Sequence, residues 1–360
     1  MILADPYVLD DPGSIELADP AGVVRAVAGA PAQLRAAAFT AAEVDLAALR
    51  DGLRPRAIVV VGSAGSATAG AALAALAAPA SPVPVIVVHG DALPAWVGAA
   101  DLVIGVAAGD ETRAPLRALE ESVRRGVPVI GVAAEGSALL DLVRSGRGVV
   151  FPATAGHVAS AGFWSLLAPL LVVARAVGVV RLPDSAVVDA ADVLDLWTER
   201  CRPSKESFLN PAKELALATS DRVALIWSTS PLSAVAAQRG ALQLAARAAM
   251  PAISACLSAA ADDSLALLDD PAAADRVAIV LLRHDDSLPL VAGRVALARE
   301  RAADRGVPLH ELTAEGDTAL SQLASLVAPI DFMSAYAALA RGLDPGRADA
   351  VAELRTGPLR

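Results

Sequence analysis

The sequence has little cysteine, few histidines and no excess of basic charge. Its two cysteines, Cys201 and Cys256, do not form a C-x-x-C pair, so we expect reduced, buried thiols rather than disulfides or a thiolate metal site. The four histidines are scattered along the chain, which argues against a zinc site. A formal net charge of −10 would repel a phosphate backbone, and no basic cluster offsets it. The sequence therefore predicts no metal and no nucleic-acid partner.

Features of secretion and membrane insertion are also missing. Near the N-terminus, "MILADPYVLDDPGSIELADP" carries acidic residues where a secretory signal would carry positive charge. The uncharged stretch 57–88 is interrupted by glycines and prolines, and the apolar stretch 158–174 is shorter than the about 20 residues that a bilayer requires. An aromatic content of 3% leaves no aromatic belt. We expect a cytoplasmic protein without a membrane partner.

Short Val- and Ile-rich segments alternate with amphipathic ones along most of the chain. Continuous apolar runs of this kind are typical of parallel strands that are covered on both faces. The expected strands of the first half are 57–62, 83–88, 101–107, 127–133 and 148–152, and those of the second half are 222–227, 251–257, 276–282 and 307–313. Helices are expected at about 20–49, 156–177, 232–249 and 288–305, and around Leu116, Leu119 and Val123.

Strands that alternate with helices predict right-handed crossovers and parallel sheets covered by helices. The length of 360 residues fits two domains, and the repeated pattern indicates an internal duplication. We therefore predict an α/β protein with two flavodoxin-like domains, each a parallel five-stranded sheet flanked by helices. The predicted domains are 1–185, including a leading helix, and 186–360.

The first strand runs into a glycine- and serine-rich turn, "VGSAGSATAG". At this edge of a doubly wound sheet, backbone N–H groups and the following helix N-terminus favour an anion. The candidate phosphate-binding residues are Gly62, Ser63, Gly65, Ser66 and Thr68. The alternative is a tight turn in which small residues only pack against the helix. The G-x-G-x-x-G spacing of a dinucleotide site is absent, so no cofactor is predicted.

The second half offers "WSTSPLSA" at the corresponding place. Ser228, Thr229 and Ser230 are consecutive hydroxyls at the start of a helix. They are candidate ligand contacts, but Ser and Thr also favour helix N-caps, and the sequence leaves both interpretations open.

Two ordered segments of the second half carry a family resemblance. They are "FLNPAKELA" (208–216) and "DFMSAYAALARGLDP" (331–345). Together with "VGSAGSATAG" and "LPAWVGAADLVIGVAAGDET", they resemble double sugar-isomerase (SIS) domain proteins, specifically the bifunctional phosphoglucose/phosphomannose isomerases. The resemblance runs from about residue 55 to the end.

The resemblance implies two SIS domains, a homodimer and sites between domains and subunits. It also implies metal-free interconversion of glucose or mannose 6-phosphate with fructose 6-phosphate through an enediol. That chemistry needs a carboxylate to move the proton, an acid to open the sugar ring and a positive charge beside the enediolate.

The residues that would supply this chemistry are mostly replaced. Where the family has S-Y-S-G-N-T, whose hydroxyls grip the phosphate, this chain keeps Gly109 but has alanines before it and two carboxylates after it. At the place of the family's P-R, the chain has His157 and Val158, so the stabilising arginine is missing. The family's E-N-A-K and P-E-x-N-H-N segments supply the base and the ring-opening histidine, and neither residue is present here. The aligned residues are Ala246 and Ala249 in the first segment, Ser258, Ala259 and Asp262 in the second, and Arg355 at the family's C-terminal lysine.

Three hypotheses follow from these replacements. The first is a sugar-phosphate-binding protein with weak or no isomerase activity. The second is an active isomerase with a rearranged site, and the third is a non-enzymatic interaction subunit. Residues that would serve the rearranged site are Glu111, Glu135, His157, Asp262 and His310.

Overall fold

A computed structural model describes residues 6–47, 49, 53–109, 113–153, 162–257, 264–284 and 288–347. The chain divides into two compact units: residues 29–191 form one, and residues 1–28 together with 192–360 form the other. The first 28 residues thus pack with the C-terminal half. These units follow contacts within the fold, and the predicted domain boundary near 185 stays a prediction.

Residues 29–191 contain a five-stranded parallel sheet in the order β2-β1-β3-β4-β5. Its strands are β1 (Ile58–Gly62), β2 (Val85–His89), β3 (Leu102–Val106), β4 (Val129–Ala133) and β5 (Val149–Pro152). Its helices are α4 (Ala30–Ala42), α6 (Ala64–Ala77), α7 (Arg113–Arg124), α8 (Ala138–Ser145) and α9 (Phe163–Ala176). The helix α10 (Ala186–Arg200) crosses from this unit into the other.

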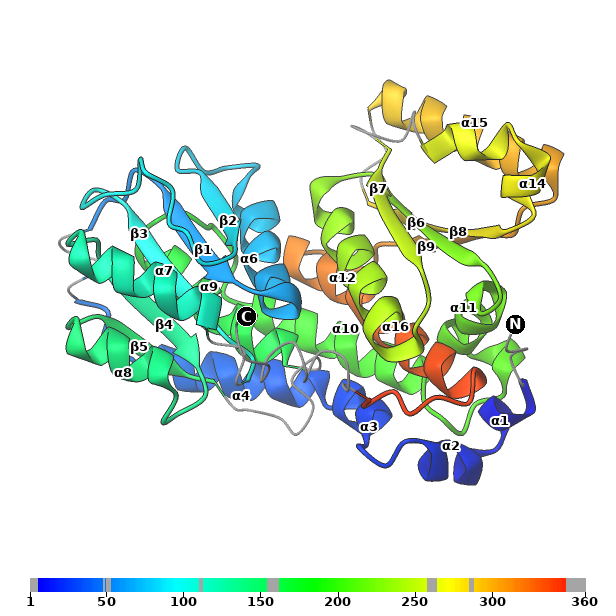
Figure 1. Cartoon of the computed structure of the whole chain (residues 1–360), viewed down its shortest axis with the longest axis horizontal. Coiled ribbons are helices and arrows are strands. Elements are labelled where there is room, and N and C mark those ends of the chain that lie inside the picture. Colours follow the sequence, from blue (N-terminus) through cyan, green and yellow to red (C-terminus); the bar gives the residue numbers. More distant parts are fainter. Residues whose placement is uncertain are drawn as a thin grey trace, which may run out of the picture. The chain divides into compact units, whose positions relative to one another are not determined.

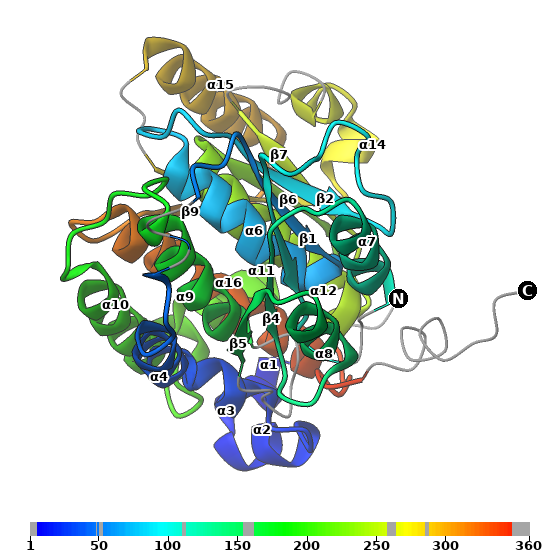
Figure 2. The ribbon, with the colours of Figure 1, turned by 90° about the vertical axis from the view of Figure 1, so that its left-hand side faces the viewer.

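Helices cover both faces of this sheet (Figure 1). The side chains along β1 alternate between the two faces. Val59 and Val61 point into the apolar core that α7 and α8 complete. Val60 points to the other face, where Gly70 of α6 lies so close that an added Cβ would be 2.7 Å from Val60 Cγ1. On that side α9 contacts α6 and also packs along α4, beside which it lies in Figure 2.

The other unit holds a parallel sheet in the order β7-β6-β8-β9. Its strands are β6 (Val223–Ser228), β7 (Ala252–Cys256), β8 (Val277–Arg283) and β9 (Leu309–Thr313). Its helices are α1 (Pro6–Asp10), α2 (Pro12–Ala18), α3 (Val23–Ala28), η2 (Ser207–Leu209), α11 (Pro211–Thr219), α12 (Pro231–Ala248), η3 (Ala266–Leu268), α14 (Pro271–Ala274), α15 (Pro289–Arg305) and α16 (Ala319–Ala340).

The two faces of this second sheet again face different helices. Leu225 and Trp227 point into the core that α15 completes, whereas Ile226 points toward α12. Gly240 lets α12 approach both the sheet and α16, because an added Cβ would lie 2.8 Å from Ile330 and 3.0 Å from Ile226. The core of this unit is therefore a sheet between one helical layer of α11, α12 and α16 and another of α14 and α15.

The predicted parallel sheets are confirmed, and every expected strand lies within two residues of an observed one. The five-stranded prediction is correct for the first sheet only. In the part of the chain that the structure describes, the second sheet has four strands. The sequence signal was consistent with this, since only four apolar runs of strand length occur after residue 220.

Among the residues that the structure describes, one helix is apolar and long enough to cross a membrane by length and composition alone. It is α16, with 22 residues, and its most apolar window is entirely buried within the protein. The apolar helices α6 and α9 are shorter. A buried core helix also passes this test of length and hydropathy. The burial of α16 is that of a core helix.

Candidate functional site

The turn after β1 is a tight strand-to-helix connection. Gly62 ends the strand and Ser63 is the N-cap of α6. A Cβ at Gly62 would lie 3.1 Å from the backbone nitrogen of Ala67 and 3.2 Å from Ser66 Oγ, so the close approach of helix and strand favours glycine there. This packing is one of the two roles that the sequence suggested for the turn.

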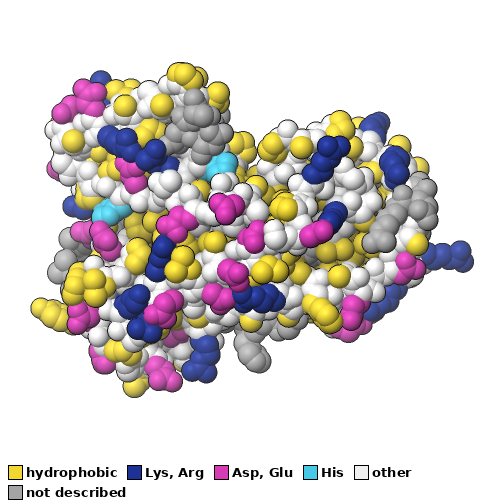
Figure 3. Space-filling view, turned by 180° about the vertical axis from the view of Figure 1, so that it is seen from behind, with side chains coloured by type: hydrophobic (Ala, Val, Ile, Leu, Met, Phe, Trp, Pro, Cys, Tyr) yellow, Lys and Arg dark blue, Asp and Glu magenta, His cyan; other side chains and the backbone are white. Residues whose placement is uncertain are grey.

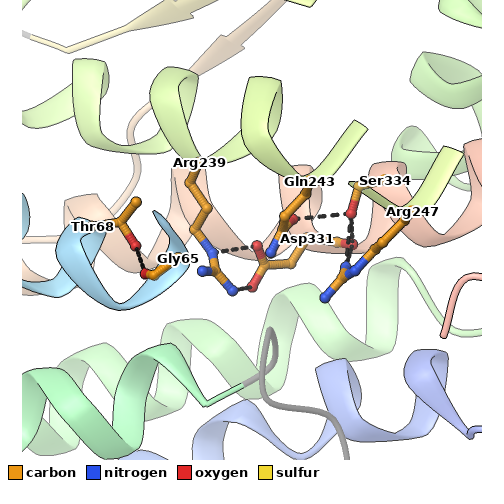
Figure 4. Close-up of polar contacts among 7 residues, drawn as sticks. All are labelled: Gly65, Thr68, Arg239, Gln243, Arg247, Asp331 and Ser334. Atoms are coloured by element: carbon orange, nitrogen blue, oxygen red, sulfur yellow. Dashed lines mark hydrogen bonds and ion pairs between the residues drawn. The ribbon is translucent and has the colours of Figure 1, made fainter. Parts of the chain in front are cut away.

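Two of the predicted phosphate-binding hydroxyls form hydrogen bonds within the turn itself. Ser66 Oγ accepts from the Ser63 N–H at 3.1 Å and donates to the Ser63 carbonyl at 2.8 Å. Thr68 Oγ1 donates to the Gly65 carbonyl at 2.5 Å, as Figure 4 shows. Both side chains are buried. Their contact with a ligand stays a prediction, whereas their role in holding the turn is visible.

The space over Gly65 differs from that over Gly62. Among the described residues, and apart from the neighbouring backbone of α6 itself, nothing lies within 4 Å of a Cβ built at Gly65, which is half-buried in the first turn of α6. The first turn of a helix exposes N–H groups that have no partner within the helix, and the helix dipole adds partial positive charge. The turn thus offers an anion open space beside polar backbone groups.

Two further residues reach the same edge of the first sheet. His89, an exposed residue, ends β2 and pairs in register with Gly62, which places its backbone next to the start of the turn. Gly109 follows β3, the other neighbour of β1. The sequence reasoning considered His89 only as a scattered residue. Its position at the end of a strand next to β1 is the signal that would have placed it here.

The corresponding turn of the second sheet is also a helix cap. Ser230 is the N-cap of α12, and its Oγ accepts from the Ser233 N–H at 3.2 Å. Ser233 Oγ in turn accepts from the N–H groups of Thr229 and Ser230, each at 3.1 Å. Ser228 Oγ donates to the Ala255 carbonyl at 3.2 Å. The capping interpretation of this turn is therefore visible, and ligand contact stays a prediction.

A histidine that the sequence reasoning did not select joins this second turn. His284 Nδ1 lies 2.9 Å from Ser230 Oγ, and its Nε2 lies 3.0 Å from Gln322 Oε1. Because β8 pairs with β6, the residue just after β8 must reach the turn that follows β6. That topology, rather than any local motif, is the signal for His284.

Of the residues suggested for a rearranged isomerase site, the structure describes Glu135 and His310, and each lies beside one oppositely charged or titratable side chain. Glu135 is exposed and forms an ion pair of 2.6 Å with Arg144. His310 Nδ1 lies 3.5 Å from Glu214 Oε1. Three of the suggested residues lie outside the described part of the chain, namely Glu111, His157 and Asp262.

The segment "FLNPAKELA" turns out to anchor the fold. Asn210 is the N-cap of α11 and accepts from the N–H groups of Ala212 and Lys213 at 3.1 and 3.2 Å. The ammonium group of Lys213 is fully buried and donates to the carbonyls of Leu9, Pro203 and Lys205. Burial lowers the pKa of Lys213, and the three carbonyls satisfy its N–H donors. Lys213 thereby ties the N-terminal helices to the C-terminal half of the chain.

The segment "DFMSAYAALARGLDP" supplies a second buried anchor, drawn in Figure 4. Asp331 of α16 accepts two hydrogen bonds from Arg239 of α12, at 2.6 and 2.9 Å, and both side chains are at least 94% buried. Arg247 donates to the Asp331 carbonyl and to Ser334 Oγ, at 3.2 and 2.8 Å. Burial lowers the pKa of Arg247 to about 10, which leaves its guanidinium charged at neutral pH.

Tyr336 of the same segment is also buried and bonded within the core. Tyr336 donates to the Cys201 carbonyl at 2.6 Å, and burial raises the pKa of its phenol. Burial also raises the pKa of the Cys201 thiol to about 12, so that cysteine is inert at neutral pH. The residues that carry the family resemblance therefore hold the scaffold together.

Charge and metal ligands add little to the site. On the face drawn in Figure 3, Lys and Arg side chains are interspersed with Asp and Glu rather than gathered into one patch. Among the residues that the structure describes, no group of three or more His, Cys, Asp or Glu side chains could hold a metal ion.

Comparison with known proteins gives matches over most of the chain. Residues 208–357 match the family model of the bacterial phospho-glucose isomerase C-terminal SIS domain. A bifunctional phosphoglucose/phosphomannose isomerase from Caldicellulosiruptor bescii is 23% identical over 265 residues, which cover 73% of this chain and 78% of that protein.

Solved structures with the same fold cover nearly the whole chain. The C-terminal domain of glucosamine-fructose-6-phosphate aminotransferase from Francisella tularensis has a TM-score of 0.68 and 18% identity, covering 89% of this chain and 96% of that one. A glucose-6-phosphate isomerase like protein from Thermus thermophilus has a TM-score of 0.59 and 19% identity, covering 96% and 98%.

Two parallel sheets covered by helices, with turns that face one edge of each sheet, define an α/β protein of SIS-like fold. The matched C-terminal segment and the distant relative indicate which SIS proteins the chain resembles. Residues 208–357 are similar to the C-terminal SIS domain of bacterial phospho-glucose isomerases, and the chain is distantly similar to a bifunctional phosphoglucose/phosphomannose isomerase.

The buried pair between α12 and α16 yields a stability prediction. Asp331→Leu leaves the Arg239 guanidinium buried without its carboxylate, which we expect to lower the free energy of unfolding by about 3–5 kcal/mol. The double variant Arg239→Met/Asp331→Leu recovers much of that loss, because it also removes the buried Arg239 charge that the carboxylate had balanced. Urea unfolding followed by circular dichroism measures both. Asp269→Leu, which removes the partner of Arg301 in an exposed pair, is the control and costs under about 1 kcal/mol. An equal loss in the single and double variants would contradict this account.

Proposed function

We propose that the protein binds a sugar phosphate at the turn between β1 and α6, and that it has weak or no hexose-6-phosphate isomerase activity. The observation that carries the proposal is the open space over Gly65 at the start of α6, and the similarity of residues 208–357 to a phospho-glucose isomerase SIS domain supports it. The phosphate would lie over Ser63 and Gly65, with His89 and Gly109 from the neighbouring strands at its sides.

The local chemistry favours an anion over a neutral ligand. Ser63 is half-buried and Gly65 has no Cβ, so phosphate oxygens can come within hydrogen-bonding distance of the backbone. The buried hydroxyls of Ser66 and Thr68 fix the turn before any ligand arrives, which lowers the entropy cost of binding. The sugar would then extend from the carboxyl edge of the sheet.

The weak activity follows from what stands at the expected catalytic positions. Small apolar residues occupy the loop after β3, where Ala107 and Ala108 precede Gly109. In the stretch aligned with the family's E-N-A-K segment, Ala246 is exposed near the end of α12, and Ala249 ends that helix in the left-handed conformation. Neither can take a proton from a sugar carbon. Removing a base and an electrostatic stabiliser costs several kcal/mol each in the transition state.

The binding proposal predicts the effect of a single added charge. Gly65→Asp places a carboxylate over the turn without a steric clash, and an acidic residue is tolerated at a helix start. We expect repulsion to weaken binding of mannose 6-phosphate or glucose 6-phosphate at least about tenfold, as measured by isothermal titration calorimetry.

The control for this experiment is Gly293→Asp, which adds the same charge at another open helical glycine, in α15. It should bind like the parent protein. Equal affinities of the Gly65→Asp variant and the parent, or no heat with either hexose phosphate, would remove the support for this site.

A second candidate function is an active aldose–ketose isomerase with a rearranged site. The observation in its favour is that an imidazole lies at the carboxyl edge of each sheet, His89 in one and His284 in the other. Either could serve as the acid that opens the sugar ring.

An activity assay separates the two functions. With glucose 6-phosphate or mannose 6-phosphate as substrate, we expect turnover at least roughly a thousandfold below that of the Caldicellulosiruptor bescii relative assayed alongside. Turnover comparable to that relative, lost in His89→Ala or His284→Ala, would instead establish the rearranged site. The Gly65→Asp variant shows whether any residual turnover depends on the same turn.

We also propose that the protein is a cytoplasmic homodimer. Large apolar side chains remain exposed in the monomer, including Phe208 at 76% and Leu290 at 64%, which supports association. Both cysteines are free thiols, as a reducing compartment would keep them. Sedimentation equilibrium should give twice the chain mass of 36.3 kDa. A monomeric mass at micromolar concentration would count against the dimer and would favour a role as a subunit of another assembly.

A further inference from the structure

A serine, a histidine and a glutamine form one hydrogen-bonded line at the carboxyl edge of the second sheet. Ser230 Oγ lies 2.9 Å from His284 Nδ1, and His284 Nε2 lies 3.0 Å from Gln322 Oε1. The three residues come from the starts of α12 and α16 and from the end of β8. A hydroxyl beside a base that a third group orients is the arrangement by which proteins activate nucleophiles.

The hydrogen bonds of Gln322 fix the proton positions in this line. Its amide nitrogen donates to the Gly316 carbonyl at 3.1 Å, so its Oε1 faces His284 as an acceptor. His284 Nε2 must therefore carry the proton. Nδ1 of the neutral ring is then an acceptor, and the hydroxyl of Ser230 donates to it. The serine proton already points at the atom that would remove it.

The backbone around the imidazole is held on the same side. Thr229 Oγ1 accepts from the His284 N–H at 2.8 Å and donates to the His284 carbonyl at 2.6 Å. Thr229, the residue after β6, is thereby hydrogen-bonded to His284, the residue after β8. The ring is held by Ser230 and Gln322 and its backbone by Thr229, so the geometry does not depend on a ligand.

The place of Ser230 also favours a negative oxygen. As the N-cap of α12, a helix of 18 residues, it lies at the positive end of the helix dipole. Its Oγ accepts the Ser233 N–H at 3.2 Å, a bond that strengthens when the oxygen carries charge. Ser230 is half-buried, so small molecules can reach it.

Helix capping alone does not account for the histidine. The helix α16 begins with the same reciprocal arrangement, in which Thr318 Oγ1 accepts from the Ser321 N–H at 3.1 Å and Ser321 Oγ accepts from the Thr318 N–H at 3.0 Å. Among the described residues, no imidazole contacts that cap. A cap of this type is complete without one.

We propose that Ser230 is a nucleophile activated by His284, and that it takes an acyl group from small carboxylic esters. Ser230 Oγ forms a bond to the carbonyl carbon while its proton passes to His284 Nδ1. The C–O bond to the alcohol then breaks, and the alcohol leaves with that proton. Water attacks the acyl-serine in the same way, giving up its proton through Nδ1 to Ser230 Oγ and releasing the carboxylic acid. Gln322 acts as a positioning residue for the imidazole.

Covalent labelling of the full-length protein tests the nucleophile. A fluorophosphonate forms a P–O bond to an activated serine with loss of fluoride, and p-nitrophenyl acetate gives a burst of p-nitrophenolate on acylation. We expect stoichiometric modification, mapped by peptide mass spectrometry to Ser230. Ser137, the N-cap of α8, is the internal control and should remain unmodified. Absence of label on Ser230, or equal labelling of both serines, would overturn the proposal.

Variants separate activation from folding. Ser230→Asn keeps a good N-cap but removes the nucleophile, so the helix should persist and the label should vanish. His284→Leu should lower the second-order labelling rate of Ser230 at least about a hundredfold. A labelling rate unchanged in His284→Leu, with native circular dichroism, would show that the histidine does not activate the serine.

The role of Gln322 has its own readout. Gln322→Glu keeps an oxygen acceptor for His284 Nε2 and should keep the labelling rate within about threefold of the parent, whereas Gln322→Leu should lower it at least about tenfold. A purely structural role would affect the melting temperature of both variants without this split in the labelling rate.

Discussion

Parallel pairing of the strands is the constraint on which the rest of this structure depends. Because all strands of a sheet run in one direction, their carboxyl ends and the N-termini of the following helices meet at a single edge. In the first sheet this edge brings together Gly62 and His89, which are far apart in the sequence but adjacent in register. In the second it brings His284 to Ser230. The positions of both candidate sites therefore follow from the pairing of the strands rather than from a local sequence motif.

The family resemblance rests on residues that hold the scaffold. Lys213 is enclosed by three carbonyls, Asp331 pairs with Arg239, and Tyr336 donates to a backbone carbonyl. A buried charge that loses its partner costs several kcal/mol, so such positions resist substitution whatever chemistry the protein performs. This explains how the segments around residues 208–216 and 331–345 remain recognisable although residues at the expected catalytic positions differ.

The sequence was most informative where one physical effect dominates. Continuous Val and Ile runs place the strands, because only strands buried on both faces tolerate them. The second sheet has four strands in the described residues, whereas five were predicted, although only four strand segments had been located in that half of the sequence. Whether a hydroxyl turns inward or toward a ligand depends on three-dimensional context, so the sequence could not tell that Ser66 and Thr68 bond within their own turn. His284 carries no local pattern at all, and only the pairing of β8 with β6 locates it.

The two turns show how one capping arrangement can support different chemistry. Each helix starts with a serine whose partner three residues on completes a reciprocal box. In the first sheet the box lies under the open space at Gly65, and the local dipole is available to an anion that arrives from solution. In the second the corresponding hydroxyl already meets an imidazole, and the dipole can instead stabilise charge that develops on Ser230 itself. In the functions proposed above, one sheet edge binds a negative group and the other develops negative charge on a side chain.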